Sequence, residues 1–144
     1  MDDEERFLTT TKTLLEKRGV TTFTASNGVD ALKVTNEHPI DVVVLDVKMP
    51  GVDGVEVLRH TKQRHPLIEV IMLTGHASVE SAVEGLKLGA FDYVTKPCDI
   101  SDLMEKVNEA CARKHAMEEK IQKAKIEKII RHPMAVFESD DEDE

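Results

Sequence analysis

Three things are scarce in this sequence: cysteine, long apolar runs and an excess of basic charge. The two cysteines, Cys98 and Cys111, are too few for a disulfide framework and show no metal-ligand spacing. No apolar run approaches the roughly 18 residues that a membrane-spanning helix needs. The N-terminus is acidic, whereas a secretory signal would be basic and then apolar. We therefore expect a soluble, reduced protein of the cytoplasm.

The charge balance argues against a general nucleic-acid-binding surface. The chain carries 28 acidic and 19 basic residues, for a formal net charge of −9. Six of the acids stand in the last seven residues, 138–144. A run of like charges with little apolar content cannot bury enough surface to fold. We expect residues 132–144 to form a disordered acidic tail.

Helix-like and strand-like segments alternate along the 144 residues, a length that suits one domain. The run 41–46 is apolar with an acid at each end, which is typical of a strand covered on both faces of a parallel sheet. The alternation predicts a doubly wound α/β domain. The pattern predicts helices over 4–18, 26–38, 54–64, 78–88 and from 100 onward, and strands over 20–25, 41–45, 69–73 and 91–94.

The sequence changes character near Cys111. Residues 112–131 hold seven basic and three acidic side chains. A stripe of residues spaced by three and four continues through them, with lysines at two of its nine places: Ile100, Leu103, Val107, Ala110, Lys114, Met117, Ile121, Ala124 and Lys128. This predicts an extended last helix, either with a weak coiled-coil seam or as a lone solvated helix. The domain division we expect is 1–113, then a helical extension over 114–131, then the tail.

Polar residues follow the predicted strands at the points where they end. Asp46, Thr74 and Lys96 stand at or just beyond three strand ends, and Asp2 and Asp3 precede the first helix. Ligands of a parallel α/β sheet bind beyond the carboxyl ends of its strands. Clustered carboxylates bind Mg²⁺, and a carboxylate can attack a phosphoryl group whose spreading charge a cation and a lysine stabilise. The set suits a phosphoryl acceptor that uses a divalent cation.

From Met1 to about Arg113, the sequence resembles the receiver domain of two-component response regulators. Each matching motif is modest alone, and all four occur in order: Asp-Asp-Glu at 2–4, Leu-Asp-Val-Lys-Met-Pro-Gly-Val-Asp-Gly at 45–54, Met-Leu-Thr-Gly at 72–75, and Gly-Ala-Phe-Asp-Tyr-Val-Thr-Lys-Pro at 89–97. The resemblance implies a flavodoxin-like sheet of strand order 2-1-3-4-5.

The resemblance also implies roles for the residues at the strand ends. Asp46 corresponds to the phosphoacceptor, which takes its phosphoryl group from a histidine kinase. Asp3 corresponds to a direct Mg²⁺ ligand, Asp2 to a water-mediated one, and the backbone carbonyl of Lys48 to a further one. Lys96 would contact the phosphate.

Two more features follow from the same resemblance. The Lys96–Pro97 peptide bond would be cis, which an X-Pro bond permits at modest cost. Thr74 and Tyr93 would form a switch pair, in which the hydroxyl turns to the phosphate and the ring follows inward. Lys48 lies two residues beyond Asp46, and His76 lies two residues beyond Thr74. Both side chains would hinder the approach of the water that hydrolyses the acyl phosphate, so we expect a phosphoryl lifetime longer than seconds.

The sequence departs from the family in one respect, because no apolar strand precedes Asp2 and Asp3. That strand is central in the 2-1-3-4-5 order, so its neighbours would lose a hydrogen-bonding partner, and a compact monomer would be destabilised. One explanation is a coding sequence that begins upstream, since a valine often precedes the acid pair and a GTG codon can be read as a start. The other is an open sheet completed by another chain.

Three functions remain open. The first is a stand-alone, non-enzymatic receiver that signals to a downstream protein, with no DNA-binding or membrane segment and with slow self-dephosphorylation at most. The second is an aspartyl-nucleophile phosphatase, which would need an acid two residues beyond Asp46, where Lys48 stands. The third is a non-phosphorylated adaptor that forms a homodimer through the C-terminal helix.

Overall fold

The computed structural model describes residues 5–46, 48–49, 52–75 and 79–131. Two helices and then three strands come first, and from residue 54 onward helices and strands alternate, as the sequence pattern predicts for this part. In chain order the elements are α1 (Glu5–Lys17), α2 (Gly28–Glu37), β1 (Val42–Asp46), β2 (Lys48–Met49), β3 (Val52–Asp53), α3 (Gly54–Arg64), β4 (Glu69–Thr74), α4 (Val79–Lys87), β5 (Asp92–Thr95) and α5 (Ile100–Arg131).

A three-stranded parallel sheet forms the centre of the molecule, in the order β1-β4-β5. β4 lies in the middle, and all six of its residues are buried. Its register places Leu73 beside Asp46 of β1 and Thr74 beside Thr95 of β5. The short strands β2 and β3 pair with each other as an antiparallel hairpin. The carboxyl ends of the three parallel strands therefore meet at one edge.

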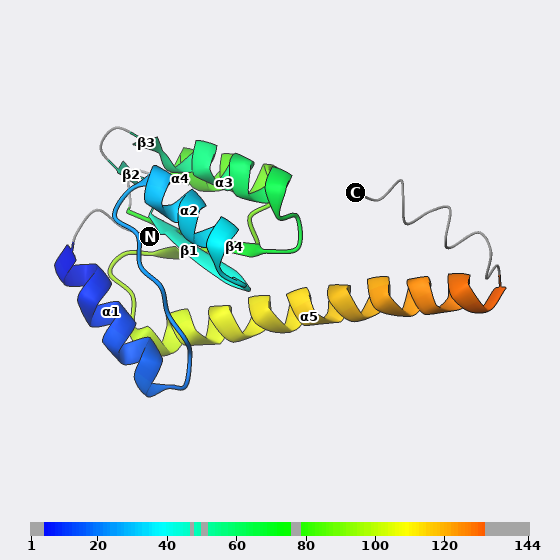
Figure 1. The fold of residues 1–144 in the computed structure, drawn as a ribbon. Coiled ribbons are helices and arrows are strands. Elements are labelled where there is room, and N and C mark those ends of the chain that lie inside the picture. Colours follow the sequence, from blue (N-terminus) through cyan, green and yellow to red (C-terminus); the bar gives the residue numbers. More distant parts are fainter. Residues whose placement is uncertain (1–4, 47, 50–51, 76–78, 132–144) are drawn as a thin grey trace.

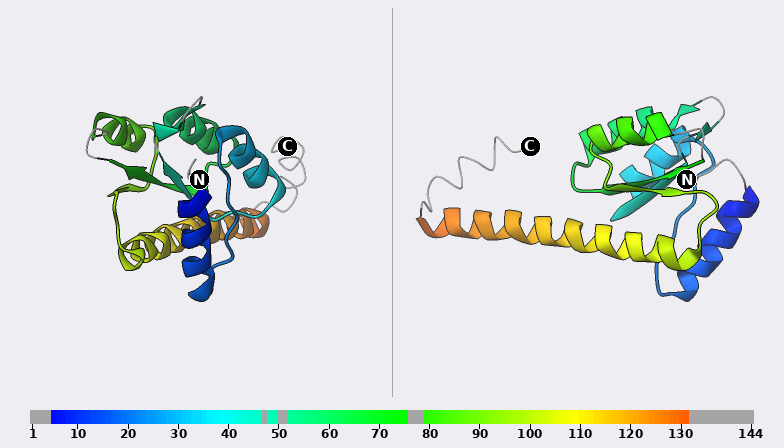
Figure 2. Two further views of the ribbon diagram at one scale, coloured as in Figure 1. Left: turned by 90° about the vertical axis from the view of Figure 1, so that its left-hand side faces the viewer. Right: turned by 180° about the vertical axis from the view of Figure 1, so that it is seen from behind.

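Helices cover both faces of this sheet (Figure 1). α2, α3 and α4 lie on one face, and α1 and α5 lie on the other, as the end-on view in Figure 2 shows. The side chains of β4 alternate between these layers. Val70 and Met72 pack into the core beside α3, whereas Ile71 and Leu73 pack against Leu103 of α5. The predicted doubly wound α/β architecture is confirmed.

The helices end where the sequence predicts. The side chain of Asn27 caps α2 by accepting a hydrogen bond of 2.9 Å from the Asp30 amide. Gly19 follows α1 with a φ of 84°, and Gly89 follows α4 with a φ of 106°. Glycine is favoured in this left-handed conformation because it has no Cβ. These residues set the lengths of the helices that flank the sheet.

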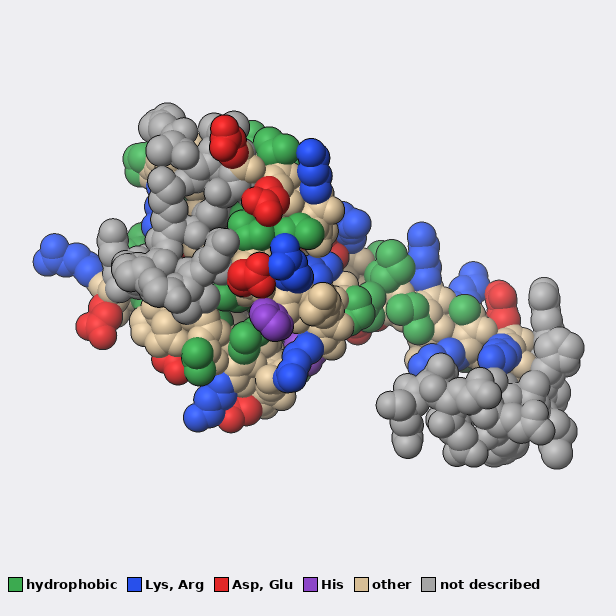
Figure 3. Space-filling view, turned by 90° about the horizontal axis from the view of Figure 1, so that it is seen from above, with side chains coloured by type: hydrophobic (Ala, Val, Ile, Leu, Met, Phe, Trp, Pro, Cys, Tyr) green, Lys and Arg blue, Asp and Glu red, His purple; other side chains and the backbone are tan. Residues whose placement is uncertain are grey.

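The last helix, α5, is 32 residues long and projects well beyond the body of the molecule (Figure 1). Its first half packs on the sheet through the buried residues Leu103, Val107 and Ala110. Basic and apolar side chains are both visible on the projecting half (Figure 3), where Met117 and Ile121 are each 41% exposed. Among the described residues, no helix is long and apolar enough to cross a membrane.

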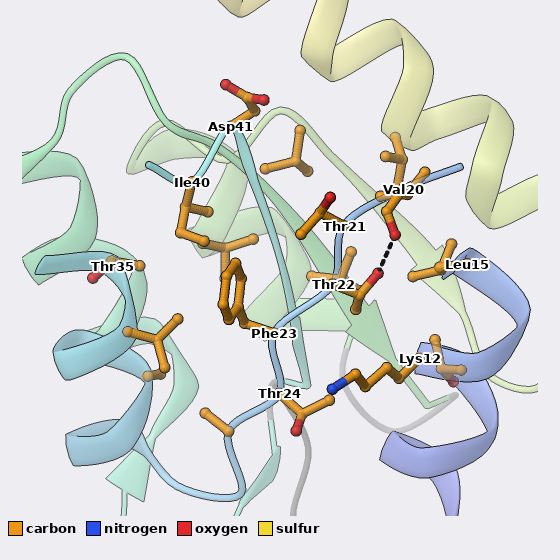
Figure 4. Close-up of a pocket in the computed structure, with 18 of the residues that line it drawn as sticks. Lys12, Leu15, Val20, Thr21, Thr22, Phe23, Thr24, Thr35, Ile40 and Asp41 are labelled. Carbon is orange, nitrogen blue, oxygen red and sulfur yellow. Dashed lines mark hydrogen bonds between the residues drawn. The ribbon is translucent and has the colours of Figure 1, made fainter. Parts of the chain in front are cut away.

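One predicted strand is wrong. Residues 20–25 run extended between α1 and α2 but pair with no strand of the described chain. The Thr22 hydroxyl instead donates a hydrogen bond of 3.0 Å to the carbonyl of Val20, two residues earlier in the chain (Figure 4). Phe23 stacks on the ring of His38 with centroids 4.2 Å apart.

A cavity of about 610 Å³ lies beside this segment. The cavity is lined by α1, residues 20–25, β1 and the first half of α5 (Figure 4). It lies where the resemblance places a central strand between residues 20–25 and β1. Because a strand needs a partner for its backbone hydrogen bonds, residues 20–25 lie extended without a ladder.

Candidate functional site

The polar residues predicted at the strand ends gather at the carboxyl edge of the sheet. Asp46 is the last residue of β1, and Thr74 is the last residue of β4. Lys96 directly follows β5, and its amide donates a hydrogen bond of 2.7 Å to the Thr74 carbonyl. The three neighbouring strands thus bring together residues that are up to 50 positions apart in the sequence.

A side-chain contact at this edge joins Asp46 and Lys96. Lys96 Nζ lies 2.9 Å from Asp46 Oδ2, which is a charge-assisted hydrogen bond. The side chain of Asp46 is only 13% exposed, and that of Lys96 is 26% exposed. Partial burial lowers the local dielectric, so the lysine stabilises negative charge here more than it would at the open surface. The Lys96–Pro97 peptide bond is cis, as the resemblance implies.

A residue that the site prediction missed also contacts Lys96. The ring of Phe7, in the first turn of α1, lies 4.7 Å from Lys96 Nζ, a cation–π distance. Phe7 belongs to the apolar spacing of the first helix, which indicates a core residue and gives no sign of a lysine contact. The contact places the start of α1 beside the carboxyl edge of the sheet.

The two residues of the expected switch pair lie on neighbouring strands with opposite exposure. Thr74 is 3% exposed, whereas Tyr93 is 45% exposed. Tyr93 stands beside Met72 in the β4–β5 register, two positions before Thr74. A buried threonine on β4 and a half-exposed tyrosine on β5 therefore lie on neighbouring strands, two register positions apart.

The other residues predicted for the site are described only in part. Asp2, Asp3 and His76 lie outside the described residues. The backbone of Lys48 lies in β2, two residues beyond Asp46. The described part of the site thus offers one carboxylate at a strand end, which is the oxygen chemistry that a hard cation such as Mg²⁺ prefers. Asp46 fits a shared metal and phosphoryl site.

Comparison with known proteins identifies the class. The family model for the response regulator receiver domain matches residues 1–108. An NtrX-like response regulator of Rickettsia typhi is 38% identical over 113 residues, which cover 77% of this chain and 24% of that protein. The DNA-binding transcriptional regulator NtrC of Escherichia coli K12 is 36% identical over 110 residues, covering 76% of this chain and 24% of its own length. This chain spans about a quarter of the length of these relatives.

Solved structures agree with the sequence comparison. A response regulator receiver domain protein from Clostridium thermocellum has a TM-score of 0.77 and 40% identity, covering 81% of this chain and 94% of its own. A receiver domain protein described as CheY-like, from Methanospirillum hungatei, has a TM-score of 0.76 and 31% identity over 81% of this chain. The fold is that of a receiver domain of two-component systems. The chain belongs to the response regulator receiver domain family.

Proposed function

We propose that this chain is a receiver that is phosphorylated on Asp46 by a histidine kinase and passes the signal to a partner protein. The observation that carries the proposal is the Asp46–Lys96 contact of 2.9 Å at the carboxyl edge of the sheet. A partly buried carboxylate with a lysine beside it is arranged to accept a group that brings negative charge. Family membership supports the same chemistry.

The transfer follows from the atoms at this edge. An Asp46 carboxylate oxygen attacks phosphorus, and the bond from phosphorus to the imidazole nitrogen of the donor breaks as the new O–P bond forms. The histidine leaves with the electron pair of the broken bond and takes up a proton. Lys96 Nζ neutralises charge that develops on the phosphoryl oxygens. Mg²⁺, when bound, would supply the second positive charge, held by Asp46, Asp2, Asp3 and the Lys48 carbonyl.

The readout proposed here uses Thr74 and Tyr93. A phosphoryl group on Asp46 offers acceptor oxygens, and a hydroxyl at the end of the neighbouring strand β4 is suited to donate to one of them. Tyr93, which is 45% exposed, would then move its ring inward. The surface formed by α4, β5 and α5 would change shape and contact the downstream protein.

The proposal does not make the chain a turnover enzyme. A phosphatase of the aspartyl-nucleophile type needs a general acid two residues after its nucleophile, and this position is Lys48. Lys48 and His76 would hinder the attacking water, so the phosphoryl group would be lost slowly. A cytoplasmic histidine kinase domain is the donor that this chemistry fits.

Intact-mass measurement tests the proposal. The protein is incubated with Mg²⁺ and a small-molecule phosphodonor, and we expect the mass of one phosphoryl group to appear. Asp46→Asn should abolish the gain. Asp41→Asn is the matched control, because Asp41 precedes the same strand at its opposite end and should leave the gain intact.

The other functions predict different outcomes. Release of many phosphates per chain would show a phosphatase, and the absence of any mass gain in a folded sample would favour the non-phosphorylated adaptor. A gain that persists in Asp46→Asn would contradict the assignment of the phosphoacceptor.

A further inference from the structure

A second group of ligating side chains lies at the other end of β1, outside the site described above. Asp41 directly precedes β1, and Cys111 and His115 stand four residues apart on α5. A carboxylate oxygen, the sulfur and a ring nitrogen all lie within 4.8 Å of one another. Residues four apart share one face of a helix, so both side chains of α5 reach toward the start of the strand.

The separations are close to those of a bound metal. Cys111 Sγ lies 3.9 Å from His115 Nε2, and His115 Nε2 lies 3.7 Å from Asp41 Oδ1. In a tetrahedral zinc site, metal–ligand distances of about 2.0–2.3 Å put neighbouring ligand atoms roughly 3.3–3.6 Å apart. Adjustments of a few tenths of an ångström would therefore bring these two ligand pairs onto one ion. His115 is half-exposed, so an ion can reach the site from solvent.

We propose that Asp41, Cys111 and His115 bind a divalent transition-metal ion of the zinc class. A thiolate, an imidazole and a carboxylate are a mixed soft and borderline set that selects Zn²⁺ over Mg²⁺ or Ca²⁺, which prefer oxygen ligands alone. Three protein ligands leave a fourth tetrahedral position for water. On binding, the Cys111 sulfur loses its proton to solvent, and the new bond is between sulfur and the metal.

Lys114 is the group that the ion must compete with. Its Nζ lies 2.8 Å from Asp41 Oδ1 and 2.7 Å from Glu118 Oε1, so it neutralises both carboxylates when no metal is bound. A dication at Asp41 would weaken the first contact and leave the second. Removing the lysine charge should therefore strengthen metal binding, a result that a purely structural role for the cluster does not predict.

The site is separate from the phosphoacceptor. Asp41 and Asp46 are five residues apart along one strand, about 16 Å at roughly 3.3 Å per residue. The ion would join the middle of α5 to the start of β1 and so hold the long helix on the sheet. The sequence pattern did not reveal the cluster, because its third member depends on how α5 packs on β1.

Titration with Co²⁺, which replaces Zn²⁺ and absorbs light, tests the proposal on the full chain. The Asp46→Asn variant is used throughout, so that the phosphoacceptor site contributes least to metal binding. We expect a thiolate-to-cobalt charge-transfer band and intense tetrahedral bands at one ion per chain, both displaced by Zn²⁺. Cys111→Ser should remove the charge-transfer band, and His115→Gln should weaken binding by more than about tenfold, since loss of an outer-shell partner alone costs that much.

Matched substitutions and a charge variant complete the test. Cys98→Ser and His60→Gln alter the other described cysteine and an exposed histidine of α3, and both should leave the spectrum unchanged. Lys114→Gln should tighten binding. Circular dichroism of each variant verifies that it is folded. Absence of the charge-transfer band, its loss in Cys98→Ser, or full affinity in His115→Gln would overturn the proposal, whatever the outcome of phosphorylation at Asp46.

Discussion

Lys96 is the residue that we propose stabilises charge at the described site. It holds Asp46 at 2.9 Å and lies over the ring of Phe7, so its position is fixed from two sides. A cation placed in advance stabilises the transition state without reorganisation during the reaction. The chemistry proposed for Asp46 depends on this one side chain among the described residues.

Replacing this lysine gives the first prediction. Lys96→Gln should lower the rate of phosphorylation by a small-molecule donor about a hundredfold, which is the typical effect of losing one charge-stabilising donor. The rate is measured from the gain of intact mass with time. Lys12→Gln removes an exposed lysine from α1 and should leave the rate unchanged. Equal rates in the two variants would contradict the role of Lys96.

Asp92 gives a prediction about pH. Burial acts to raise the pKa of Asp92, but hydrogen bonds from Lys106 and from the Tyr93 amide, with the Lys106 charge, outweigh it and hold the pKa below its ordinary value. The ionised carboxylate therefore stabilises the fold above the ordinary aspartate pKa of about 4, and this contribution is lost as pH falls through the lowered value.

Carbon-detected NMR of the Asp92 carboxyl group measures this effect. Lys106→Gln should raise the pKa of Asp92 toward its ordinary value and reduce the loss of stability in urea unfolding below pH 4. An Asp92 pKa that does not change in this variant would show that the ion pair between β5 and α5 has no such influence.

At the scale of elements, α4 packs on the sheet through a glycine. A Cβ on Gly85 would overlap the thioether of Met72 in β4. It would also lie 3.5 Å from the side chain of Leu58 in α3. Inserting atoms into a packed core costs typically 1–3 kcal/mol. Gly85→Val should therefore lower the free energy of unfolding by about that amount in urea denaturation.

The control for this substitution is also a glycine. A Cβ on Gly75 would meet no atom of the described residues within 4 Å, and its φ is not in the left-handed region. Gly75→Ala should change the free energy of unfolding by less than about 0.5 kcal/mol, as surface substitutions usually do. Similar losses in both variants would mean that close packing of α4 on β4 is not the cause.

The elements also show what could be predicted from the sequence. The runs that became β1 and β4 are mostly apolar, and these two strands and β5 lie within a residue or two of their predicted positions. The strand expected over 20–25 failed because a strand depends on a neighbour, and residues 20–25 have none among the described strands. The Phe7–Lys96 contact depends on how α1 packs on the sheet, which spacing along one helix does not report.

For the molecule as a whole, the open flank of β1 is a weak point of the sheet. β4 is paired on both sides, whereas β1 is paired with β4 alone among the described strands and faces the cavity of about 610 Å³ on its other flank. An edge without a partner and an apolar cavity both lower the free energy of unfolding. We therefore expect β4 to be more stable than β1.

Amide hydrogen exchange tests this order of stability. We expect the amides of β4 to exchange more slowly than those of β1, because opening β1 breaks one ladder and opening β4 breaks two. Peptide-level mass spectrometry resolves residues 42–46 from 69–74. Protection of β1 equal to that of β4 would mean that its open flank is covered in solution.

The central claim is that Asp46 itself takes the phosphoryl group. Borohydride reduces an acyl phosphate to an alcohol, so treatment of the phosphorylated protein marks the modified aspartate before peptide mapping. The account predicts a reduced residue at position 46 and an unmodified Asp41 and Asp53 in the same digest. A reduced residue elsewhere, with Asp46 intact, would contradict it.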